Sequence, residues 1–185
     1  MTRELVVLAG PDGLPAGTMD KSEIHSAHTP LHFAFSAWVI RDGKVLVSRR
    51  ALGKKTWPGV WTNSYCGHPG PGEEPRQAVV RRGAFELGLA ESALESISEV
   101  LPDFSYRAVD SSGIVEHEIC PVFVVRLAAD ARVYPNPEEV DSVQWVAVDN
   151  LIAGVEATGF AFSPWMVEEL QHPELRSALS VQAAR

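Results

Sequence analysis

Residues 67–89 read GHPGPGEEPRQAVVRRGAFELGL, a loop of glycine and proline that runs into a helix-like segment. Residues 69–72 predict a loop, and Pro75 is favoured at the first position of a helix, with two glutamates before it to complement the helix dipole. Apolar side chains then recur at helical spacing, and Gly88 predicts the end of the helix. The stretch therefore predicts a glycine loop that leads directly into a helix.

The preceding stretch, residues 57–68, reads WPGVWTNSYCGH. Pro58-Gly59 predicts a turn, and residues 60–66 predict a short strand rich in aromatic and β-branched side chains. Because side chains alternate across a strand, Cys66 and His68 point to the same side if the pairing continues that far. A thiol and an imidazole on one face can share a site. The alternative is a buried cysteine beside a solvated histidine, which is the commoner situation for a free cysteine.

The chain has 185 residues, 45% of them hydrophobic and 22% charged, which is ordinary for a globular protein. This length predicts a single domain over residues 1–185. No apolar run approaches the ~20 residues of a membrane span, and the first nine residues carry no cleavage pattern, so we expect no membrane segment and no signal peptide. Two cysteines 54 positions apart do not form a disulfide framework, and we expect a reduced, cytoplasmic protein.

The net charge of −8 argues against nucleic-acid binding as the main role of the chain. Its distribution is uneven, because residues 41–82 hold nine of the sixteen Lys and Arg and only three acidic residues, a local charge of +6. A solvated surface explains part of this excess. The pairs Arg49-Arg50 and Lys54-Lys55, beside a loop rich in glycine and proline, also suit a small polyanion such as a diphosphate.

The rest of the chain predicts short strands followed by helices. Residues 11–17 predict a turn and residues 19–30 an irregular polar segment, while Asp42-Gly43 between two apolar runs predicts a hairpin. We expect strands at residues 4–9, 32–40, 44–49, 96–101, 103–109, 113–127 and 140–148, and helices at 149–153, 163–171 and 173–184. This order predicts an α/β (α+β) fold, a mixed β-sheet with helices on its faces.

A dispersed set of imidazoles and carboxylates predicts a metal site. Glu116 and Glu118 lie two apart in a predicted strand and hence on one face, where two carboxylates repel unless a cation or a proton is shared. Together with His25, His32 and His68 they would form a mixed nitrogen and oxygen site for a divalent ion. The alternative is that the two glutamates line a solvated strand face.

The stretch quoted first resembles the Nudix box, G-x5-E-x7-R-E-U-x-E-E-x-G-U, in which U is an apolar residue. The positions that match are Gly67, Glu73, Arg81, Glu86, Gly88 and Leu89. Arg82 and Phe85 stand where the family has glutamates, and Gly83 stands where it has an apolar residue. Glycine in the helix costs about 1 kcal/mol relative to alanine.

In Nudix hydrolases the glutamates hold the metals that polarise a scissile diphosphate. The resemblance implies a Nudix-like mixed sheet sandwiched between helices, with its core at about residues 31–150 and with an N-terminal strand and C-terminal helices added. It does not imply that the hydrolytic machinery is present. A Nudix pyrophosphohydrolase and a non-catalytic diphosphate sensor are the alternatives.

Four runs together resemble one branch of this superfamily, the type I isopentenyl-diphosphate isomerases of isoprenoid biosynthesis. They are LHFAFSAW (31–38), SRRALGKKTWPGVWTNSYCGHPGPGE (48–73), RAVDSSGIVEHEICPVF (107–123) and AFSPWM (161–166). The resemblance spans about residues 19–170. It implies interconversion of isopentenyl and dimethylallyl diphosphate, a small prenyl diphosphate as the only partner apart from metal ions, and a monomer or dimer that binds neither nucleic acid nor membranes.

The resemblance also implies a role for each matching residue. Cys66 and Glu118 would be the acid–base pair, assisted by Tyr106, and Tyr106 and Trp165 would line the hydrocarbon pocket. His25, His32, His68, Glu116 and Glu118 would bind Mn²⁺, Mg²⁺ or Zn²⁺, and Glu86 would hold a second ion, Mg²⁺, that meets the diphosphate. Lys21, Arg50, Lys54 and Arg82 would contact the diphosphate itself.

Moving a double bond within an unactivated alkene requires that one carbon gains a proton and another loses one, here through a tertiary carbocation. Cys66 would exchange a proton on one face of the substrate and Glu118 on the other, and the roles reverse with the direction of reaction. Trp165 would stabilise the cation through its π face, by ~2 kcal/mol once desolvated.

Overall fold

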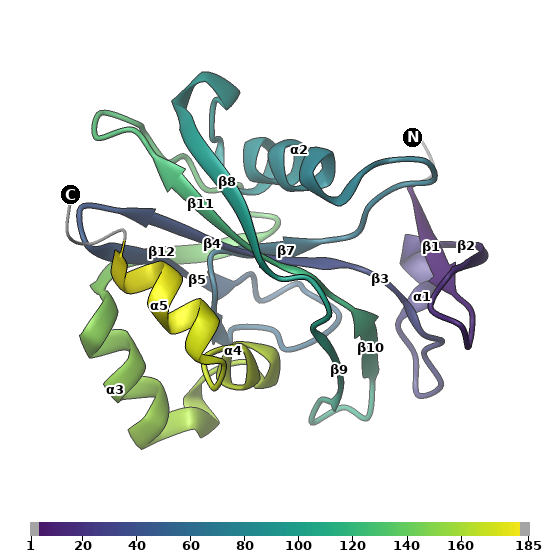
Figure 1. Cartoon of the computed structure of the whole chain (residues 1–185). Coiled ribbons are helices and arrows are strands. Elements are labelled where there is room, and N and C mark those ends of the chain that lie inside the picture. The colour runs from purple at the N-terminus through teal and green to yellow at the C-terminus, as the bar shows by residue number, and fades with distance from the viewer. Residues whose placement is uncertain (1–3, 182–185) are drawn as a thin grey trace.

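The structure, a computed structural model, describes residues 4–181 and contains two β-sheets (Figure 1). The larger sheet has the strand order β12 (Val140–Ala147), β5 (Lys44–Arg50), β4 (Phe35–Arg41), β11 (Val122–Leu127) and β8 (Leu94–Leu101). Two short strands extend it, β6 (Trp61–Thr62) beside β5 and β7 (Tyr65–Gly67) beside β4. The smaller sheet has the order β2 (Pro15–Asp20), β1 (Leu5–Ala9), β3 (His32–Phe33), β10 (Val115–Ile119) and β9 (Ser105–Val109).

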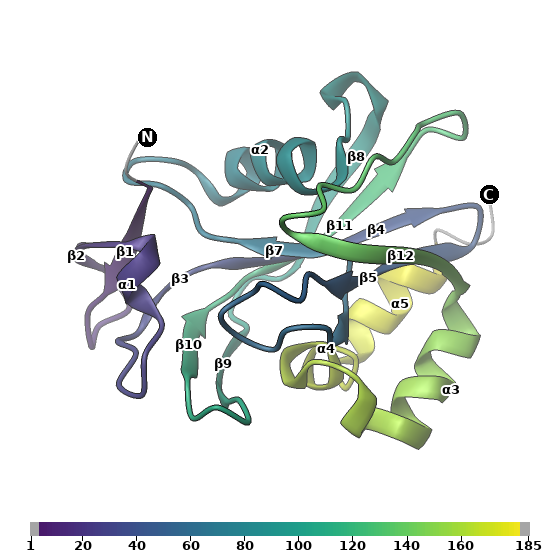
Figure 2. The same ribbon diagram turned by 180° about the vertical axis from the view of Figure 1, so that it is seen from behind.

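Helices cover both faces of the larger sheet. Helix α2 (Pro75–Leu87) lies on one face, and α3 (Val148–Thr158), α4 (Pro164–Glu169) and α5 (Pro173–Val181) lie on the other, as both views show (Figures 1 and 2). A short helix, α1 (Lys21–Ile24), follows β2, and single 3-10 turns span Glu91–Ala93 and Gly159–Ala161. This arrangement confirms the predicted α/β (α+β) class, a mixed sheet between helices with strands added before it and helices after it.

The core has two parts, because side chains alternate along β4 and are buried on both faces of the sheet. Phe35, Ala37 and Val39 pack with buried residues of α2 such as Val79. Trp38 and Ile40 point the other way and belong to a second cluster with apolar side chains of α3, α4 and α5. The two clusters hold α2 and the C-terminal helices on opposite sides of one sheet, because each apolar face is covered by a different helix layer.

Two segments predicted as single strands each pass from one sheet to the other. Residues 32–40 form β3 and β4, interrupted at Ala34, and residues 113–127 contain β10 and β11, interrupted at Cys120-Pro121. The two crossings are side by side, since the Ala34 amide donates to the Ile119 carbonyl at 2.9 Å and the pairs β3–β10 and β4–β11 are both parallel. Proline lacks an amide hydrogen, which favours the break at this point. The crossing sets His32 opposite Glu118 in the strand register.

The prediction of one strand over residues 60–66 was wrong, because Asn63 and Ser64 separate β6 from β7. Both side chains are buried, and the Ser64 hydroxyl donates to the Leu46 carbonyl at 2.5 Å and accepts from the Val39 amide at 2.7 Å. A polar side chain that satisfies backbone groups of neighbouring strands competes with regular pairing.

The N-terminal segment is more regular than predicted. Residues 15–17 of the predicted turn belong to β2, and the predicted irregular segment at 19–30 contains the end of β2 and helix α1. Asp20 caps this helix, since its carboxylate accepts from the Ser22 amide at 2.9 Å.

The C-terminal helices differ from the prediction mainly at their ends. Helix α3 extends to Thr158 rather than 153, and α4 ends at Glu169 rather than 171. Residues 182–184 of the last predicted helix lie outside the described residues.

Two turn predictions were confirmed in detail. Asp42 and Gly43 have φ angles of 49° and 70°, as a tight hairpin turn requires, and Gly88 ends α2 with a φ of 62°. The structure also explains Gly83, for which sequence suggested only close packing. A β-carbon at this position would lie 2.8 Å from the Tyr65 hydroxyl oxygen, so glycine allows α2 to approach β7 closely.

Candidate active site

A cavity of about 530 Å³ is lined by residues of both sheets. Eleven of the predicted site residues contribute to its walls: Lys21, His25, Arg50, Lys54, Cys66, His68, Arg82, Tyr106, Glu116, Glu118 and Trp165. The other two, His32 and Glu86, are buried and are not part of the lining. One cavity therefore gathers residues that lie more than 140 positions apart in the sequence, from Lys21 to Trp165.

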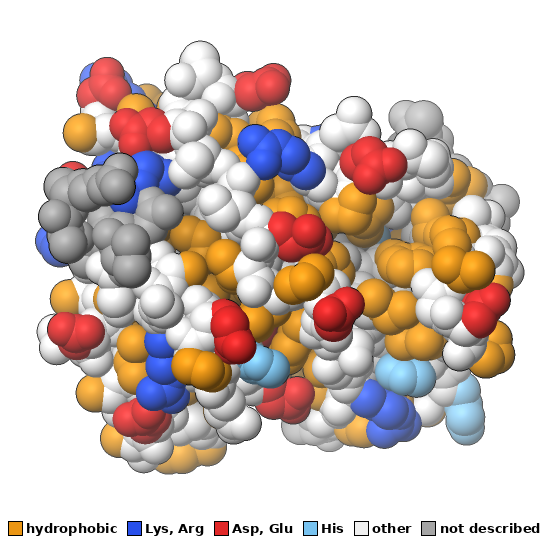
Figure 3. Space-filling view, in the orientation of Figure 1, with side chains coloured by type: hydrophobic (Ala, Val, Ile, Leu, Met, Phe, Trp, Pro, Cys, Tyr) orange, Lys and Arg blue, Asp and Glu red, His pale blue; other side chains and the backbone are white. Residues whose placement is uncertain are grey.

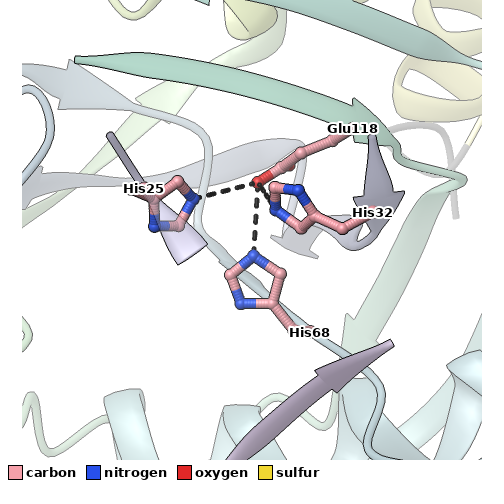
Figure 4. A group of neighbouring side chains, drawn as sticks. All are labelled: His25, His32, His68 and Glu118. Atoms are coloured by element: carbon pink, nitrogen blue, oxygen red, sulfur yellow. Dashed lines mark hydrogen bonds and ion pairs between the residues drawn. The ribbon is translucent and has the colours of Figure 1, made fainter. Parts of the chain in front are cut away.

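Three histidines point at one carboxylate of Glu118 (Figure 4). His25 follows α1, His32 begins β3 and His68 follows β7, so three separate segments converge on β10. The Oε1 atom of Glu118 lies 3.8 Å from Nε2 of His25 and 3.3 Å from Nε2 of both His32 and His68. The four ligand atoms lie within 4.8 Å of one another, so a single ion between them could contact all four.

The donor atoms of this cluster suit a divalent metal ion. Nδ1 of His32 lies 2.9 Å from the Pro30 carbonyl, to which only a protonated nitrogen can donate, so the lone pair of its Nε2 faces the cluster. Nε2 of His32 and Nε2 of His25 are buried and make no hydrogen bond among the described residues. Buried polar atoms without a partner are rare, and convergent imidazoles with a carboxylate form a common mixed ligand set.

The pKa shifts of two histidines in the cluster differ in direction. Burial opposes the charged form of His32, but its contact with the Glu118 carboxylate raises its pKa overall. Burial lowers the pKa of His68 to about 4, which keeps the ring neutral, as a metal ligand must be. Burial alone would raise the pKa of Glu118, but the three histidines hold it well below its usual range. The exposed side chain of His28, which lies between two of these histidines in the sequence, is not part of the cluster.

The second predicted glutamate ligand, Glu116, lies beside the cluster and is not one of the four convergent donors. The Tyr106 hydroxyl lies 2.7 Å from Oε2 of Glu116 and 3.0 Å from Oε2 of Glu118, and its single proton can be donated to only one of them at a time. Thr56 donates to the other oxygen of Glu116 at 2.5 Å. Tyr106 thus connects two carboxylates of β10 at the wall of the cavity.

The thiol of Cys66 lies near the side chain of Asn63, which is fully buried. Nδ2 of Asn63 lies 3.3 Å from Sγ, and Oδ1 accepts from the indole nitrogen of Trp165 at 2.9 Å. Burial raises the pKa of the Cys66 thiol well above its usual range, and the nearby carboxyl groups of Glu169 and Glu118 add to the rise. The same amide therefore contacts the sulfur and the large aromatic side chain of the cavity.

Trp165 is 1% exposed and is packed by aromatic and cationic neighbours. Its ring centroid lies 5.7 Å from that of Tyr106 and 5.4 Å from that of Trp57. The guanidinium carbon of Arg50 lies 5.3 Å from the Trp165 ring centroid, while its Nε and Nη2 donate to the Thr56 carbonyl at 3.1 and 2.9 Å. Arg50 is thereby held at the aromatic wall.

The other three cations predicted to contact the diphosphate each contact a carboxylate. Lys21 donates to Glu4 at 3.0 Å, and Lys54 forms an ion pair with Glu139. Arg82 contacts Glu86 at 2.6 Å and Glu139 at 3.1 Å, and although burial opposes its charged form, the two carboxylates raise its pKa. Glu86, predicted to hold a second metal ion, accepts from Arg82 and is not one of the four donors of the histidine cluster.

Sequence reasoning missed three polar residues of the site, Thr56, Asn63 and Glu139. Asn63 lay in a run that matched a family but had no assigned role, and Thr56 follows the Lys54-Lys55 pair directly. Glu139 carries no local signal, because only the fold brings it to Lys54 and Arg82, 85 and 57 positions away.

Comparison with known proteins agrees with this geometry. A family model described as the NUDIX domain matches residues 30–166. The isopentenyl-diphosphate Delta-isomerase of Corynebacterium diphtheriae is 60% identical over 178 residues, which cover 96% of this chain and 97% of the relative. The protein of the same name from Salmonella arizonae is 48% identical over 181 residues, covering 97% of both chains.

Solved structures resemble the chain in fold at low sequence identity. A Deinococcus radiodurans protein, DR0079, has a TM-score of 0.69 at 20% identity and covers 91% of this chain and 98% of its own. A MutT NUDIX hydrolase from Burkholderia pseudomallei has a TM-score of 0.56 at 21% identity and covers 77% and 98%. These structures establish the NUDIX fold, while the closer relatives match along almost the whole chain. The chain therefore belongs to the isopentenyl-diphosphate Delta-isomerase family of NUDIX domain proteins.

Proposed function

We propose that this protein is an isomerase that interconverts isopentenyl diphosphate and dimethylallyl diphosphate by adding a proton to one carbon and removing one from another, through a tertiary carbocation. One observation carries the proposal beyond family membership. Cys66 and the Tyr106–Glu118 pair line the same cavity, together with the basic side chains that a diphosphate needs. An allylic proton shift needs two proton-transfer groups of this kind around one short hydrocarbon chain.

The acid–base chemistry falls to residues of two different sheets. We assign proton transfer on one side of the substrate to Cys66 and on the other to Glu118, with Tyr106 in hydrogen-bond contact with Glu118. Hydrogen-bond exchange along Glu116, Tyr106 and Glu118 offers a route by which a proton reaches the cavity wall. Reversal of the reaction exchanges the roles of thiol and carboxyl group.

His25, His32, His68 and Glu118 would hold a divalent ion, and we propose Mn²⁺ or Mg²⁺, with Zn²⁺ as the third choice. When bound, the ion would supply positive charge next to the Glu118 carboxyl group and so alter its acidity. We further propose that Glu116 completes this site from its position beside Tyr106, and that Glu86 holds a Mg²⁺ ion that accompanies the diphosphate.

The basic side chains around the cavity suit the diphosphate. Lys21, Lys54 and Arg82 line one cavity with Arg50, and each is already paired with a carboxylate or a carbonyl. Arg82 occupies the position of a Nudix glutamate, so a cation replaces a metal ligand there. A site that binds a diphosphate through cations, with fewer carboxylates to polarise the bridging bond, favours binding without hydrolysis.

The hydrocarbon end needs a dry, aromatic environment. Trp165 and Tyr106 are 1% and 7% exposed, and both line the cavity. A developing carbocation beside an indole face is stabilised by the ring quadrupole, and exclusion of water strengthens this interaction. We propose that these two rings bind the prenyl chain and stabilise its cation.

We propose that residues 1–185 form one domain and act in the cytoplasm as a monomer or dimer on this small substrate alone. No helix within residues 4–181 is long and apolar enough to span a membrane. On the face shown in Figure 3, acidic and basic side chains are interspersed, and the net charge is −8. Neither feature favours a nucleic acid as partner.

The test is ¹H NMR of isopentenyl diphosphate in D₂O with the purified protein and Mg²⁺ or Mn²⁺. We expect dimethylallyl diphosphate to appear with deuterium incorporated and without release of phosphate. Release of inorganic phosphate or diphosphate in place of isomerisation would indicate a pyrophosphohydrolase. Binding of the substrate with no exchange and no release would indicate a diphosphate sensor.

A further inference from the structure

Glu169 is a fully buried carboxyl group to which the proposed reaction assigns no role. It lies on α4 with 0% exposure, and among residues 4–181 no cationic side chain pairs with it. Its Oε2 accepts from the Ser36 hydroxyl at 2.9 Å and from the Trp38 indole nitrogen at 2.6 Å, while Oε1 makes no hydrogen bond with any residue that the structure describes. Burial of a carboxyl group costs free energy, so we expect its hydrogen-bonded oxygen to have a specific structural role.

The hydrogen bonds from Glu169 lead in one direction, towards the cavity. Because Ser36 donates its only hydroxyl proton to Glu169, its oxygen is left as an acceptor, and it accepts from Nδ2 of Asn63 at 2.9 Å. Nδ2 also lies 3.1 and 3.0 Å from the carbonyl oxygens of Ala37 and Tyr65, so Ser36 is one of three oxygen acceptors that hold the Asn63 amide with Nδ2 on this side and Oδ1 on the opposite side. A flipped amide would place two donors or two acceptors against each other at both ends.

The orientation of that amide matters to two residues of the proposed site. Nδ2 of Asn63 lies 3.3 Å from Sγ of Cys66, and Oδ1 accepts from Nε1 of Trp165 at 2.9 Å. Trp165 and Glu169 are four residues apart on α4, hence on the same helix face, so one short helix carries both the aromatic wall and the group that anchors it. Two hydrogen bonds thus connect Glu169 to the Asn63 amide through Ser36 of β4, and this amide, in the β6–β7 turn, contacts the Cys66 sulfur.

We propose that Glu169 is a positioning residue for the isomerisation: by accepting from Ser36 it keeps the Ser36 oxygen available as an acceptor for the Asn63 amide, and so helps to hold that amide against the Cys66 thiol and the Trp165 ring. The inference rests on the proposed isomerase function and adds a residue outside the cavity lining to it. What is required at position 169 is an oxygen acceptor, and a negative charge is not required. Burial raises the pKa of Glu169 to about 8, so the neutral acid predominates at neutral pH and still offers this acceptor.

This distinction leads to a pair of substitutions. Glu169→Gln retains a carbonyl oxygen of the same reach, whereas Glu169→Met retains the size of the side chain and removes the acceptor. We expect kcat for isopentenyl diphosphate to fall at least about tenfold in Glu169→Met, because small displacements of reacting groups are costly in rate, with KM changed by less than about threefold. We expect Glu169→Gln to keep kcat within about threefold of the wild type.

The neighbouring Glu168 gives a matched control, since it is exposed on the same helix and lies outside the cavity lining, so Glu168→Met should leave kcat unchanged. Ser36→Ala breaks the same connection from β4, and its loss of kcat should not add to that of Glu169→Met in the double variant. Ser36→Ala alone also serves as the test if Glu169→Met does not fold.

The outcomes separate the inference from the proposed function. A wild-type protein that fails to isomerise the substrate contradicts the proposed function itself. With an active wild type, the inference is overturned by full activity of Glu169→Met or Ser36→Ala, by an equal loss in Glu169→Gln and Glu169→Met, or by additive losses in the double variant.

Discussion

Cys66 and Glu118 face one cavity from strands of different sheets. Cys66 lies on β7, which pairs with β4 of the larger sheet, and Glu118 lies on β10 of the smaller sheet. They meet there because the chain crosses between the sheets twice in parallel, from β3 to β4 and from β10 to β11. The proposed proton shift between two carbons would use this thiol and this carboxyl group, which line the same cavity.

The first prediction concerns the thiol. Cys66→Ala should lower the rate of proton exchange by at least roughly 10², the usual contribution of a general acid or base, with little loss of stability. The measurement is deuterium incorporation into isopentenyl diphosphate by NMR, with circular dichroism to verify the fold. Cys120→Ala is the control, since Cys120 is 1% exposed in the core and should affect stability more than rate. Near-normal isomerisation by Cys66→Ala would reject the assignment.

The second prediction concerns the metal cluster. Removal of divalent ions by EDTA should abolish activity, and Mg²⁺ or Mn²⁺ should restore it. The same ions should raise the melting temperature of the wild type, because an ion that binds only the folded state stabilises it. His68→Ala should lose the thermal shift, while His28→Ala should keep it, since the exposed His28 is not part of the cluster. An equal shift in both variants would contradict the proposed ligands.

The third prediction concerns the hydroxyl that connects the two glutamates of β10. Tyr106→Phe removes the contacts of 2.7 and 3.0 Å to Glu116 and Glu118 but keeps the ring beside Trp165. We expect kcat to fall at least about tenfold, which is less than the ~10²-fold or more of a general acid or base because Tyr106 only assists Glu118, with KM little changed. Tyr134→Phe, at an exposed tyrosine, is the matched control. A rise in KM at constant kcat would instead assign Tyr106 to binding alone.

Local sequence signals predicted the helices and turns better than they predicted polar contacts between residues far apart in the sequence. The loop into α2, its start at Pro75 and its end at Gly88 follow from short-range rules and were confirmed. The strand break at Ala34 was missed because a continuous apolar run does not reveal which sheet each half joins. The break at Cys120-Pro121 did carry a local signal, the proline, which the prediction of one strand over residues 113–127 passed over. The convergence of His25, His32, His68 and Glu118 followed from a family resemblance, since no pair of histidines has the spacing of a known metal motif.

The contacts of Glu139 and Glu169 could not be predicted from sequence at all. Glu139 meets Lys54 and Arg82 across 85 and 57 positions, and Glu169 meets Ser36 across 133. Both carboxyl groups follow another glutamate in the sequence, so the pattern does not distinguish them from solvated acids. Only the packing of α4 against β4, and of the loop before β12 against α2, shows that they are buried or half-buried.

The fourth prediction is a pH dependence of stability that comes from Glu169. Burial raises its pKa from 4.5 to about 8 in the folded protein, opposed by its bonds to Trp38 and Ser36, and Glu118 and Glu168 add to the rise. Between these values the folded state holds a proton that the unfolded state has lost, so the contribution to stability falls as pH rises, by up to about 1.4 kcal/mol per pH unit. This contribution of Glu169 to the free energy of unfolding is fully present below pH 4.5 and lost above about pH 8.

Glu169→Gln removes this titration while keeping the packing. Urea unfolding at pH 5, 6.5 and 8 should therefore show the variant gaining stability relative to the wild type as pH rises. Because both proteins share all other titrating groups, including the histidine cluster, the difference between their curves isolates residue 169. Parallel curves would show that Glu169 is ionised in the folded state throughout this range.

The last prediction tests the close approach of α2 to β7. In a helix interior, alanine normally stabilises by about 1 kcal/mol relative to glycine, but at position 83 a β-carbon would meet the Tyr65 hydroxyl oxygen at 2.8 Å and the adjacent ring carbon at 3.1 Å. We expect Gly83→Ala to destabilise the protein by about 1–3 kcal/mol, the usual penalty for overpacking. Tyr65→Phe removes the nearer atom, so the double variant should lose less than the sum of the two single changes. Chemical unfolding of the four proteins measures this coupling, and a stabilised Gly83→Ala would mean that α2 can move away from β7 at no cost.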